Sequence, residues 1–265
     1  MPEGHVIHRA ARRLASVLVG RELADVQARG RDLVEARAAE RLRGDTVTEV
    51  VPLGKNLLIH FASGWSIYSH LKMDGVWHLY RSGERWRKSR RAMWLVLDTG
   101  EWQAVNFNGV DLELHRTDEL MRDSRITMLG PDVLDPAFDE QEYLARMRGR
   151  GNHRELGDAL MRQNIICGIG NIYKAESCFL ALADPWRAVA TYSDDELLEI
   201  RRIATRIMVD GVLDQRVVTF HGPGPAGQWV YGRHRQPCRR CGQRVRMREQ
   251  GADQRVTWWC AHCQT

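Results

Sequence analysis

The sequence predicts an α+β protein: an N-terminal antiparallel β-sandwich that follows a helix, and then a helical domain that ends in a cysteine-rich β-hairpin. Three observations support this prediction. Between about residue 47 and residue 116, short runs typical of strands alternate with turn signals. From residue 138 the apolar residues recur with the helical period. Two Cys-x-x-Cys motifs follow near the C-terminus, at Cys238–Cys241 and Cys260–Cys263.

A helix over residues 5–18 is the first predicted element, because Ile7, Ala11 and Leu18 recur at helical spacing. Turn signals such as Ser63-Gly64 separate the strands that follow it. Four strands are predicted clearly, at Asn56–Ala62, Trp65–Leu71, Gly75–Tyr80 and Ala92–Thr99. Successive strands at such short spacing favour an antiparallel sandwich or barrel.

Two prolines between residues 128 and 136 end the β region, so we expect a domain boundary there. In the helical part, Ser193 followed by Glu196 is a capping box that begins a helix. We expect this helix to end at Gly211. The sequence therefore predicts four segments: a β-sandwich domain at 1–127, a linker at 128–136, a helical domain at 137–230 and a cysteine-rich module at 231–265.

The composition is that of a globular protein with a basic end. Hydrophobic residues make up 43% of the chain, which argues against disorder, and no stretch approaches the ~18 consecutive apolar residues of a membrane helix. The net charge is +5, and residues 231–265 hold eight arginines but only two acids. A concentrated basic end favours a nucleic-acid partner, although a solvated tail would have the same composition. The basic run Arg85–Arg91 is expected to be a solvated loop.

The cysteine spacing predicts one tetrahedral zinc site. Cys238-x2-Cys241-x18-Cys260-x2-Cys263 supplies two thiolate pairs. Because four cysteines fill the coordination sphere and leave no position for water, the metal is expected to be structural, in a zinc-finger β-hairpin. Cys167 and Cys178 are expected to be ordinary buried thiols.

A second motif, Gly168-Ile169-Gly170-Asn171, predicts a tight turn before a helix that starts near Asn171. Free N–H groups at a helix N-terminus, with an asparagine side chain beside them, can bind a phosphate. Taken alone, this motif favours a plain helix–helix turn.

The N-terminus offers a nucleophile. Removal of Met1 would leave Pro2 with a free amine beside the carboxylate of Glu3. An α-amine with a pKa near 8 is tens of per cent neutral at about pH 7.5, whereas a lysine near 10.4 is only ~0.1% neutral. The adduct of a proline amine with a sugar aldehyde is a cationic iminium, which promotes β-elimination. In isolation the same residues could be an ordinary chain start, which also lacks the basic start and apolar run of a signal peptide.

These motifs together resemble the formamidopyrimidine-DNA glycosylase and endonuclease VIII family over the whole chain. Five segments carry the resemblance: Pro2-Glu3-Gly4 as the endonuclease VIII start, Gly54-Lys55-Asn56 as the lysine loop, Ser69–Gly75 as the void-filling loop, Gly168–Glu176 as the helix–two-turn–helix signature, and Tyr231-Gly232-Arg233 with the four cysteines and Arg255 as the zinc finger.

The resemblance implies a bifunctional DNA glycosylase and abasic-site lyase that acts on damaged DNA in base excision repair, through an imine at Pro2 followed by β/δ-elimination. Glu3 would protonate the ring oxygen and shuttle protons. Met73 would fill the space left by the extruded nucleotide, and the polar residues on either side of it favour an exposed turn over a core position. The phosphates around that nucleotide would be bound by Lys55, Asn171 and Arg255, with His70 beside them.

Two departures from the family pattern bear on the substrate. His5 and Val6 replace a Pro-Glu pair that relatives often carry, and the stretch Asn106–Gly109 lacks the arginine that the purine-directed branch uses to probe the opposite base. Together with Gly4, this favours the endonuclease VIII branch and oxidised pyrimidines. A purine-directed enzyme of the same fold and a non-catalytic, zinc-containing DNA-damage-binding protein remain the alternatives. We expect a cytoplasmic, nucleoid-associated monomer without a membrane segment or a small-molecule cofactor.

Overall fold

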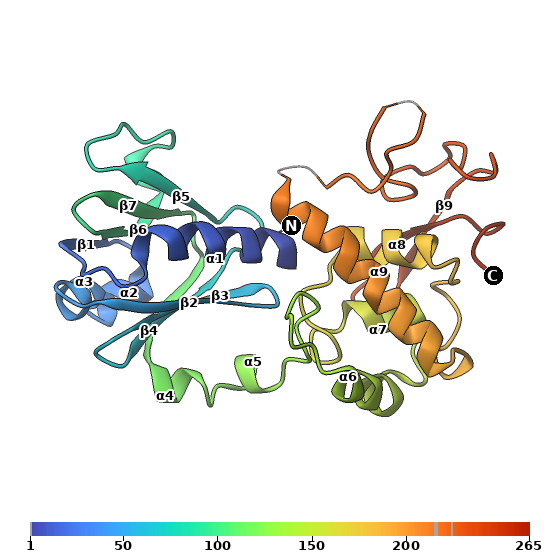
Figure 1. Ribbon diagram of the computed structural model, residues 1–265, viewed down its shortest axis with the longest axis horizontal. Helices are drawn as coiled ribbons and strands as arrows, with labels where there is room; N and C mark the ends of the chain where they lie inside the picture. The colour runs from blue at the N-terminus through green and yellow to red at the C-terminus, as the bar shows by residue number, and fades with distance from the viewer. Residues whose placement is uncertain (1, 215–216, 224) are drawn as a thin grey trace. The chain divides into compact units, whose positions relative to one another are not determined.

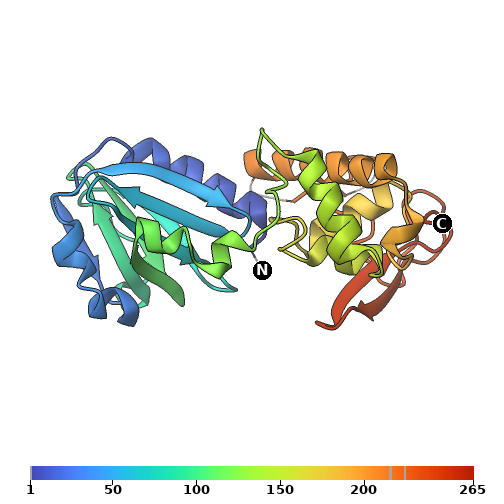
Figure 2. The same cartoon turned by 90° about the horizontal axis from the view of Figure 1, so that it is seen from below.

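The computed structural model describes residues 2–214, 217–223 and 225–265, and the chain divides into two compact units, the first ending at Thr127 and the second beginning at Met128. Figures 1 and 2 show the elements of both units, and each unit is described separately below.

The first unit is a sandwich of two four-stranded antiparallel sheets with α1 (Gly4–Leu18) packed beside them. One sheet has the order β2-β3-β4-β8, from Val47–Leu53, Asn56–Phe61, Trp65–His70 and Asp111–Arg116. The other has the order β1-β6-β7-β5, from Asp25–Ala28, Met93–Asp98, Trp102–Phe107 and Val76–Arg81. The apolar stripe of α1 and the inner faces of both sheets form one hydrophobic core. This confirms the predicted α+β class and the predicted antiparallel sandwich.

Short elements that the sequence did not predict complete this unit: β1, α2 (Arg31–Glu35), α3 (Ala38–Leu42), the 3-10 turn η1 (Arg90–Ala92), α4 (Thr117–Leu120) and α5 (Ser124–Thr127). Each is at most five residues long, which is too short for a helical or alternating pattern to be recognised. Packing fixes α2 and α3 instead, because Leu33 and Leu42 are fully buried in the same core.

The second unit is a cluster of helices around its own core. Its helical elements are α6 (Glu140–Arg146), the π-helical turn η2 (Met147–Gly151), α7 (Leu156–Met161), α8 (Asn171–Leu180), the 3-10 turn η3 (Val189–Thr191) and α9 (Asp194–Leu213). The predicted capping box at the start of α9 is present, because the side chains of Ser193 and Glu196 each accept from the other residue's backbone N–H. The predicted end at Gly211 is wrong, since α9 continues to Leu213 with Gly211 buried. A glycine inside a helix costs only about 1 kcal/mol, which a buried position can outweigh.

The segment from 128 to 136 is an ordered part of the second unit. Gly130 donates its N–H to the carbonyl of Gln163 over 2.8 Å, and Val133 is fully buried in the helical core. A Cβ on Gly130 would lie only 2.3 Å from the carbonyl oxygen of Ile165, so a glycine is required at this close approach. The two prolines therefore mark the boundary of the β region without creating a free connection.

A two-stranded hairpin, β9 (Arg246–Gln250) and β10 (Arg255–Trp259), forms the C-terminal module, and α8 packs against β10. In the described part of the chain, no helix combines the length and the apolar character needed to cross a membrane.

Candidate active site and nucleic-acid interface

Glu3 and Pro2 lie at the N-terminal end of α1. Glu3 is the N-cap residue in an extended conformation, its carbonyl accepts from the N–H of Val6 over 2.9 Å, and its side chain is only 3% exposed. A carboxylate at this position is stabilised by the positive end of the helix dipole. Pro2 is partly exposed. The structure therefore places a buried carboxyl group next to an accessible proline.

His5, on the first turn of α1, is buried and uncharged at neutral pH. Burial, with a smaller contribution from the positive charge of Arg9, lowers the pKa of His5 to about 4. The side chain at position 5 is thus a neutral imidazole.

Lys55 occupies the turn between β2 and β3. The turn is tight, because Leu53 pairs with Asn56 and Gly54 has a φ of 60°. Asn56 locks it, donating to the carbonyl of Leu53 over 3.1 Å and accepting from the Tyr68 hydroxyl over 2.8 Å. In Figures 1 and 2 this turn and the N-terminal end of α1 lie at the same end of the sandwich.

His70 ends β4 next to this turn, since it pairs with Asn56 in the sheet. Burial lowers the pKa of His70, and the charges of Lys72 and Lys55 lower it further while Asp111 opposes them. Its Nδ1 accepts from the N–H of Lys72 over 3.1 Å. This imidazole is therefore neutral with its Nε2 protonated and able to donate.

Met73 is the apolar tip of the turn that follows His70. Its side chain is 63% exposed, so the alternative of a core methionine is excluded. Lys72 has a left-handed φ of 48° and its Nζ pairs with Asp111 over 2.8 Å. The turn therefore holds a large apolar side chain in solvent.

A second turn, between β7 and β8, braces the first and carries a residue that the sequence did not single out. Asn108 donates through Nδ2 to the carbonyl of Asp74 at 3.5 Å, and Asp111 forms the ion pair with Lys72. Val110 in this turn is 59% exposed. A lone valine before a strand carries no sequence signal, and only its exposure beside the Met73 turn identifies it.

In the second unit, Asn171 is the first residue of α8 and follows the predicted glycine turn. Gly168 has a φ of 95°, and Gln163 fixes the turn by accepting from its N–H over 3.1 Å and donating to the Ile169 carbonyl over 3.1 Å. Among the residues described, Asn171 Oδ1 is buried without a hydrogen-bond partner. The start of α8 thus presents a helix N-terminus and a polar side chain whose hydrogen bonding is incomplete.

Arg255 begins β10, beside the N-terminal half of α8. The buried Lys174 of α8 donates to Thr257 Oγ1 over 2.6 Å and to the carbonyl of Val256 over 3.4 Å. Arg255 itself is exposed and forms no ion pair with any residue from 2–214, 217–223 or 225–265. Its charge is available to an external anion, at the start of a strand that packs against α8.

Glu176 anchors the chain that enters the C-terminal module, a role that sequence reasoning missed. Its buried carboxylate accepts from the backbone N–H groups of Trp229, Val230 and Tyr231 over 2.7, 2.9 and 2.8 Å, and also from the Thr219 hydroxyl. A charged acceptor of several N–H groups is a strong, geometrically defined link.

The four predicted cysteines converge. Their sulfur atoms all lie within 4.8 Å of one another, with Cys238 and Cys263 3.9 Å apart and Cys241 and Cys260 3.5 Å apart. Four sulfurs at 2.3 Å from a tetrahedral zinc are about 3.8 Å apart, so the cluster has the dimensions of such a site. Cys167 and Cys178 are buried elsewhere, as expected.

Comparison with known sequences decides the family. Residues 1–126 match the family described as the formamidopyrimidine-DNA glycosylase N-terminal domain, and residues 129–221 match the H2TH domain of the same glycosylase. The chain belongs to the formamidopyrimidine-DNA glycosylase and endonuclease VIII family. The predicted enzyme class, a DNA glycosylase with lyase activity at abasic sites, is confirmed by this membership.

Relatives in this family carry the endonuclease VIII name. The chain is 37% identical to "Probable endonuclease 8 2" of Streptomyces coelicolor, covering all of this chain and 94% of the relative. It is 35% identical to "Endonuclease 8 2" of Mycobacterium tuberculosis, over the full length of both. It is 33% identical to "DNA-(apurinic or apyrimidinic site) lyase Nei2" of Mycolicibacterium smegmatis, covering all of this chain and 99% of the relative.

Solved structures of the family share the fold. The glycosylase Fpg (MutM) of Lactococcus lactis, solved with DNA containing N7-benzyl-Fapy-dG, has a TM-score of 0.80 at 22% identity over both full chains. MutM in complex with carbocyclic 8-oxo-G containing DNA has a TM-score of 0.78 at 22% identity over both full chains. At this identity the likeness concerns the fold, and it confirms the architecture predicted for the glycosylase.

Proposed function

We propose that this glycosylase removes oxidised pyrimidines from DNA and then cleaves the strand through a covalent imine at Pro2. The observation that carries the proposal is that the accessible Pro2 directly precedes the buried Glu3 at the start of α1. Binding to DNA alone would need neither residue.

The chemistry follows from these two groups. After removal of Met1, the Pro2 amine attacks the sugar C1′, the bond from C1′ to the damaged base breaks, and the base leaves in its neutral form with the proton that the amine nitrogen gives up. Glu3 gives a proton to the ring oxygen as the sugar opens, which leaves a cationic iminium between the protein and the sugar. Loss of a proton from C2′ then expels the 3′ phosphate, and a second elimination expels the 5′ phosphate.

The remaining predicted residues would hold the nucleotide outside the duplex. Lys55 and His70 lie at one end of the β2-β3-β4-β8 sheet, and both can contact phosphate, Lys55 as a cation and His70 as a donor through Nε2. Asn171 and Arg255 offer a second grip in the other unit. Met73, with Val110 beside it, would occupy the space that the base leaves.

The preference for pyrimidines rests on the residues that replace the purine-directed pattern. Asn106 is fully buried in β7 and cannot reach an opposite base. The exposed residue in the turn between β7 and β8 is Val110. Relatives at 33–37% identity carry endonuclease VIII or abasic-site lyase names, which supports the same branch.

The C-terminal cysteines would hold one zinc ion in a purely structural role, through Cys238, Cys241, Cys260 and Cys263. Cys260→Ser should release the metal and unfold the hairpin module, because metal binding and folding of such a module are one free energy. Elemental analysis of purified protein should give about one zinc per chain. Active protein without zinc would refute this assignment.

Borohydride trapping tests the main proposal. With an oligonucleotide that contains dihydrouracil, borohydride should reduce the iminium to a stable cross-link that peptide mapping places at Pro2. A version with extra residues ahead of Pro2 should bind DNA but neither trap nor cleave, because its proline nitrogen is then an amide. Trapping at the native rate by the extended protein would move the nucleophile elsewhere, with Lys55 as the next candidate.

The substrate is tested with the same assay on a second lesion. We expect excision of thymine glycol or dihydrouracil to be faster than excision of 8-oxoguanine opposite cytosine. The reverse preference would assign the enzyme to the purine-directed branch while leaving the role of Pro2 intact.

A further inference from the structure

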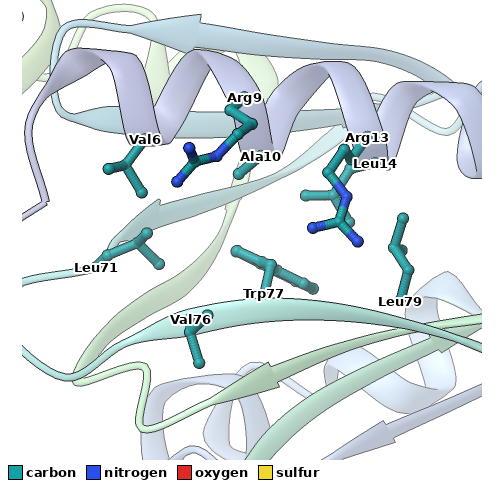
Figure 3. A pocket seen from close by; sticks show the side chains of 9 residues that line it. All are labelled: Val6, Arg9, Ala10, Arg13, Leu14, Leu71, Val76, Trp77 and Leu79. Carbon is teal, nitrogen blue, oxygen red and sulfur yellow. The ribbon is translucent and has the colours of Figure 1, made fainter. Parts of the chain in front are cut away.

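The first unit contains a small pocket that the proposed chemistry does not use. It has a volume of about 100 Å³ and lies between α1 and β5, lined by the apolar side chains of Val6, Ala10, Leu14, Trp77 and Leu79 among others. Figure 3 shows these side chains facing one another across the space between the helix and the strand. The lining residues extend for about two turns along α1, away from Pro2.

Two arginines form the basic rim of the pocket. Arg9 and Arg13 project from α1 over the apolar floor, with Trp77 beneath them (Figure 3). Arg13 is exposed and makes no ion pair with any residue that the structure describes. Some arginines of the same unit are paired, as Arg21 is with Glu101 and Arg125 with Glu113, whereas Arg12 on α1 is exposed like Arg13.

Neither α1 nor β5 contains an aspartate or a glutamate, although Glu3 directly precedes α1 and Asp74 lies just before β5. His78, which the charges of Arg87 and Lys88 reach, packs against Tyr80 and Phe107 on the face of β5 opposite Trp77 and Leu79. The positive charges at the pocket itself are therefore those of Arg9 and Arg13.

The size of the pocket limits what it can hold. Sites for cofactors and drug-sized ligands enclose roughly 300–1,000 Å³, whereas a cavity of roughly 150 Å³ already binds benzene. A pocket of about 100 Å³ that is open on one side fits a single leucine- or phenylalanine-sized side chain.

We propose that this pocket, with Arg9 and Arg13 at its rim, is a docking site for an acidic peptide segment of a partner protein that inserts one apolar side chain between α1 and β5. The apolar floor takes the side chain, and the exposed guanidinium group of Arg13 binds a carboxylate beside it. A nucleic acid is the less suitable occupant, because a phosphate backbone would use the arginines but leave the apolar floor without a contact.

A designed peptide tests the site directly. The probe is a fluorescein-labelled peptide in which four acidic residues precede a C-terminal phenylalanine, and its binding to the full-length protein is followed by fluorescence anisotropy. We expect saturable binding that is lost when the phenylalanine is replaced by alanine or the acidic residues by their amides. Arg13→Glu should weaken binding by about tenfold or more, the effect of reversing one contacting charge.

Arg12→Glu is the matched control, because Arg12 is exposed on the same helix but does not line the pocket. It should change peptide binding far less than Arg13→Glu does. Ala10→Phe should fill the pocket and also abolish binding, while Arg13→Glu keeps DNA nicking at the native rate. Arg13 is at the surface, so its variant remains informative if Ala10→Phe does not fold.

Three results would overturn the proposal: no saturable binding of the probe, equal losses with Arg12→Glu and Arg13→Glu, or displacement of the peptide by undamaged duplex DNA together with weaker DNA binding by Arg13→Glu. The last result would instead make this face a path for nucleic acid. None of them depends on Pro2 chemistry, which the trapping experiment tests separately.

Discussion

Burial of His5 makes the first turn of α1 sensitive to acid. The imidazole is 5% exposed and its folded-state pKa is about 4, whereas the pKa of a histidine in the unfolded chain is 6.5. Between these values the unfolded chain binds more protons than the folded one, so stability is complete above about pH 6.5 and falls as the pH is lowered toward 4. At pH 5 the expected loss from this residue is about 2 kcal/mol.

His5→Gln tests this, because glutamine cannot take up a proton in this range. Urea unfolding at pH 7.5 and pH 5.0 should show that the wild-type protein loses about 2 kcal/mol more than the variant between the two conditions. Titration of groups other than His5 changes the free energy of unfolding equally in both proteins, so it cancels in the comparison. Equal losses for both proteins would mean that His5 is protonated in the folded state at pH 5.

Single residues differ in how far the sequence reveals their roles. The cysteine quartet was predicted from its spacing alone, and its four sulfurs do converge. Pro2 and Glu3 were singled out by their chemistry together with the family resemblance, and their catalytic roles stay a prediction. The role of Glu176 was not predicted, because a carboxylate on an apolar helix face gives no sign of the partners it will have more than fifty residues later, the backbone of residues 229–231. The exposure of Val110 could not be predicted from the sequence either. It depends on the turn between β7 and β8, which is held in place by its contact with the Met73 turn.

At the scale of elements, two turns that contact each other carry exposed apolar side chains at one end of the sandwich. The ion pair of Lys72 with Asp111 and the contact of Asn108 with Asp74 hold Met73 and Val110 in solvent, which is costly unless something covers them. Insertion of these side chains between the bases of an opened stack would cover them.

Met73→Ala should therefore slow base excision from duplex DNA more than it slows cleavage of a preformed abasic site in single-stranded DNA. The reason is that only the duplex reaction must open a stack, which costs a few kcal/mol per step. Single-turnover rates on the two substrates measure the effect, and Met128→Ala, an exposed methionine in the other unit, is the control. Equal losses on both substrates would indicate a general defect in place of a wedge.

Element boundaries followed the sequence where a pattern was long enough. α1 and the strands β3 to β6 begin and end within one residue of their predicted limits, because amphipathic periodicity and turn residues act locally. α9 passed its predicted end, and β1, α2 and α3 were not predicted, because their formation depends on the tertiary core.

At the scale of the whole molecule, the contacts of the C-terminal module with α8 decide where its basic side chains lie. Lys174 joins β10 to α8, so that the exposed Arg255 and the helix start at Asn171 lie on two elements that pack against each other. The sequence predicted Arg255 as a phosphate ligand only through the family resemblance, whereas the glycine turn before Asn171 also suggested a phosphate site. The link between their two elements became visible only from the buried contacts of Lys174.

Arg255→Ala measures whether this charge binds phosphate. Each protein cation that neutralises a phosphate releases a counterion, so the logarithm of the binding constant falls with the logarithm of the salt concentration by about 0.9 per contact on duplex DNA. The variant should bind all duplex sequences more weakly and with a salt slope that is shallower by about one unit. Anisotropy titrations between 50 and 200 mM salt give the slope.

Arg202→Ala is the control, because Arg202 is exposed on α9 but already pairs with Glu140 over 3.4 Å, and it should leave the slope unchanged. If Arg255→Ala also keeps the wild-type slope, the arginine lies outside the DNA interface, and its place at the start of β10 serves the hairpin alone.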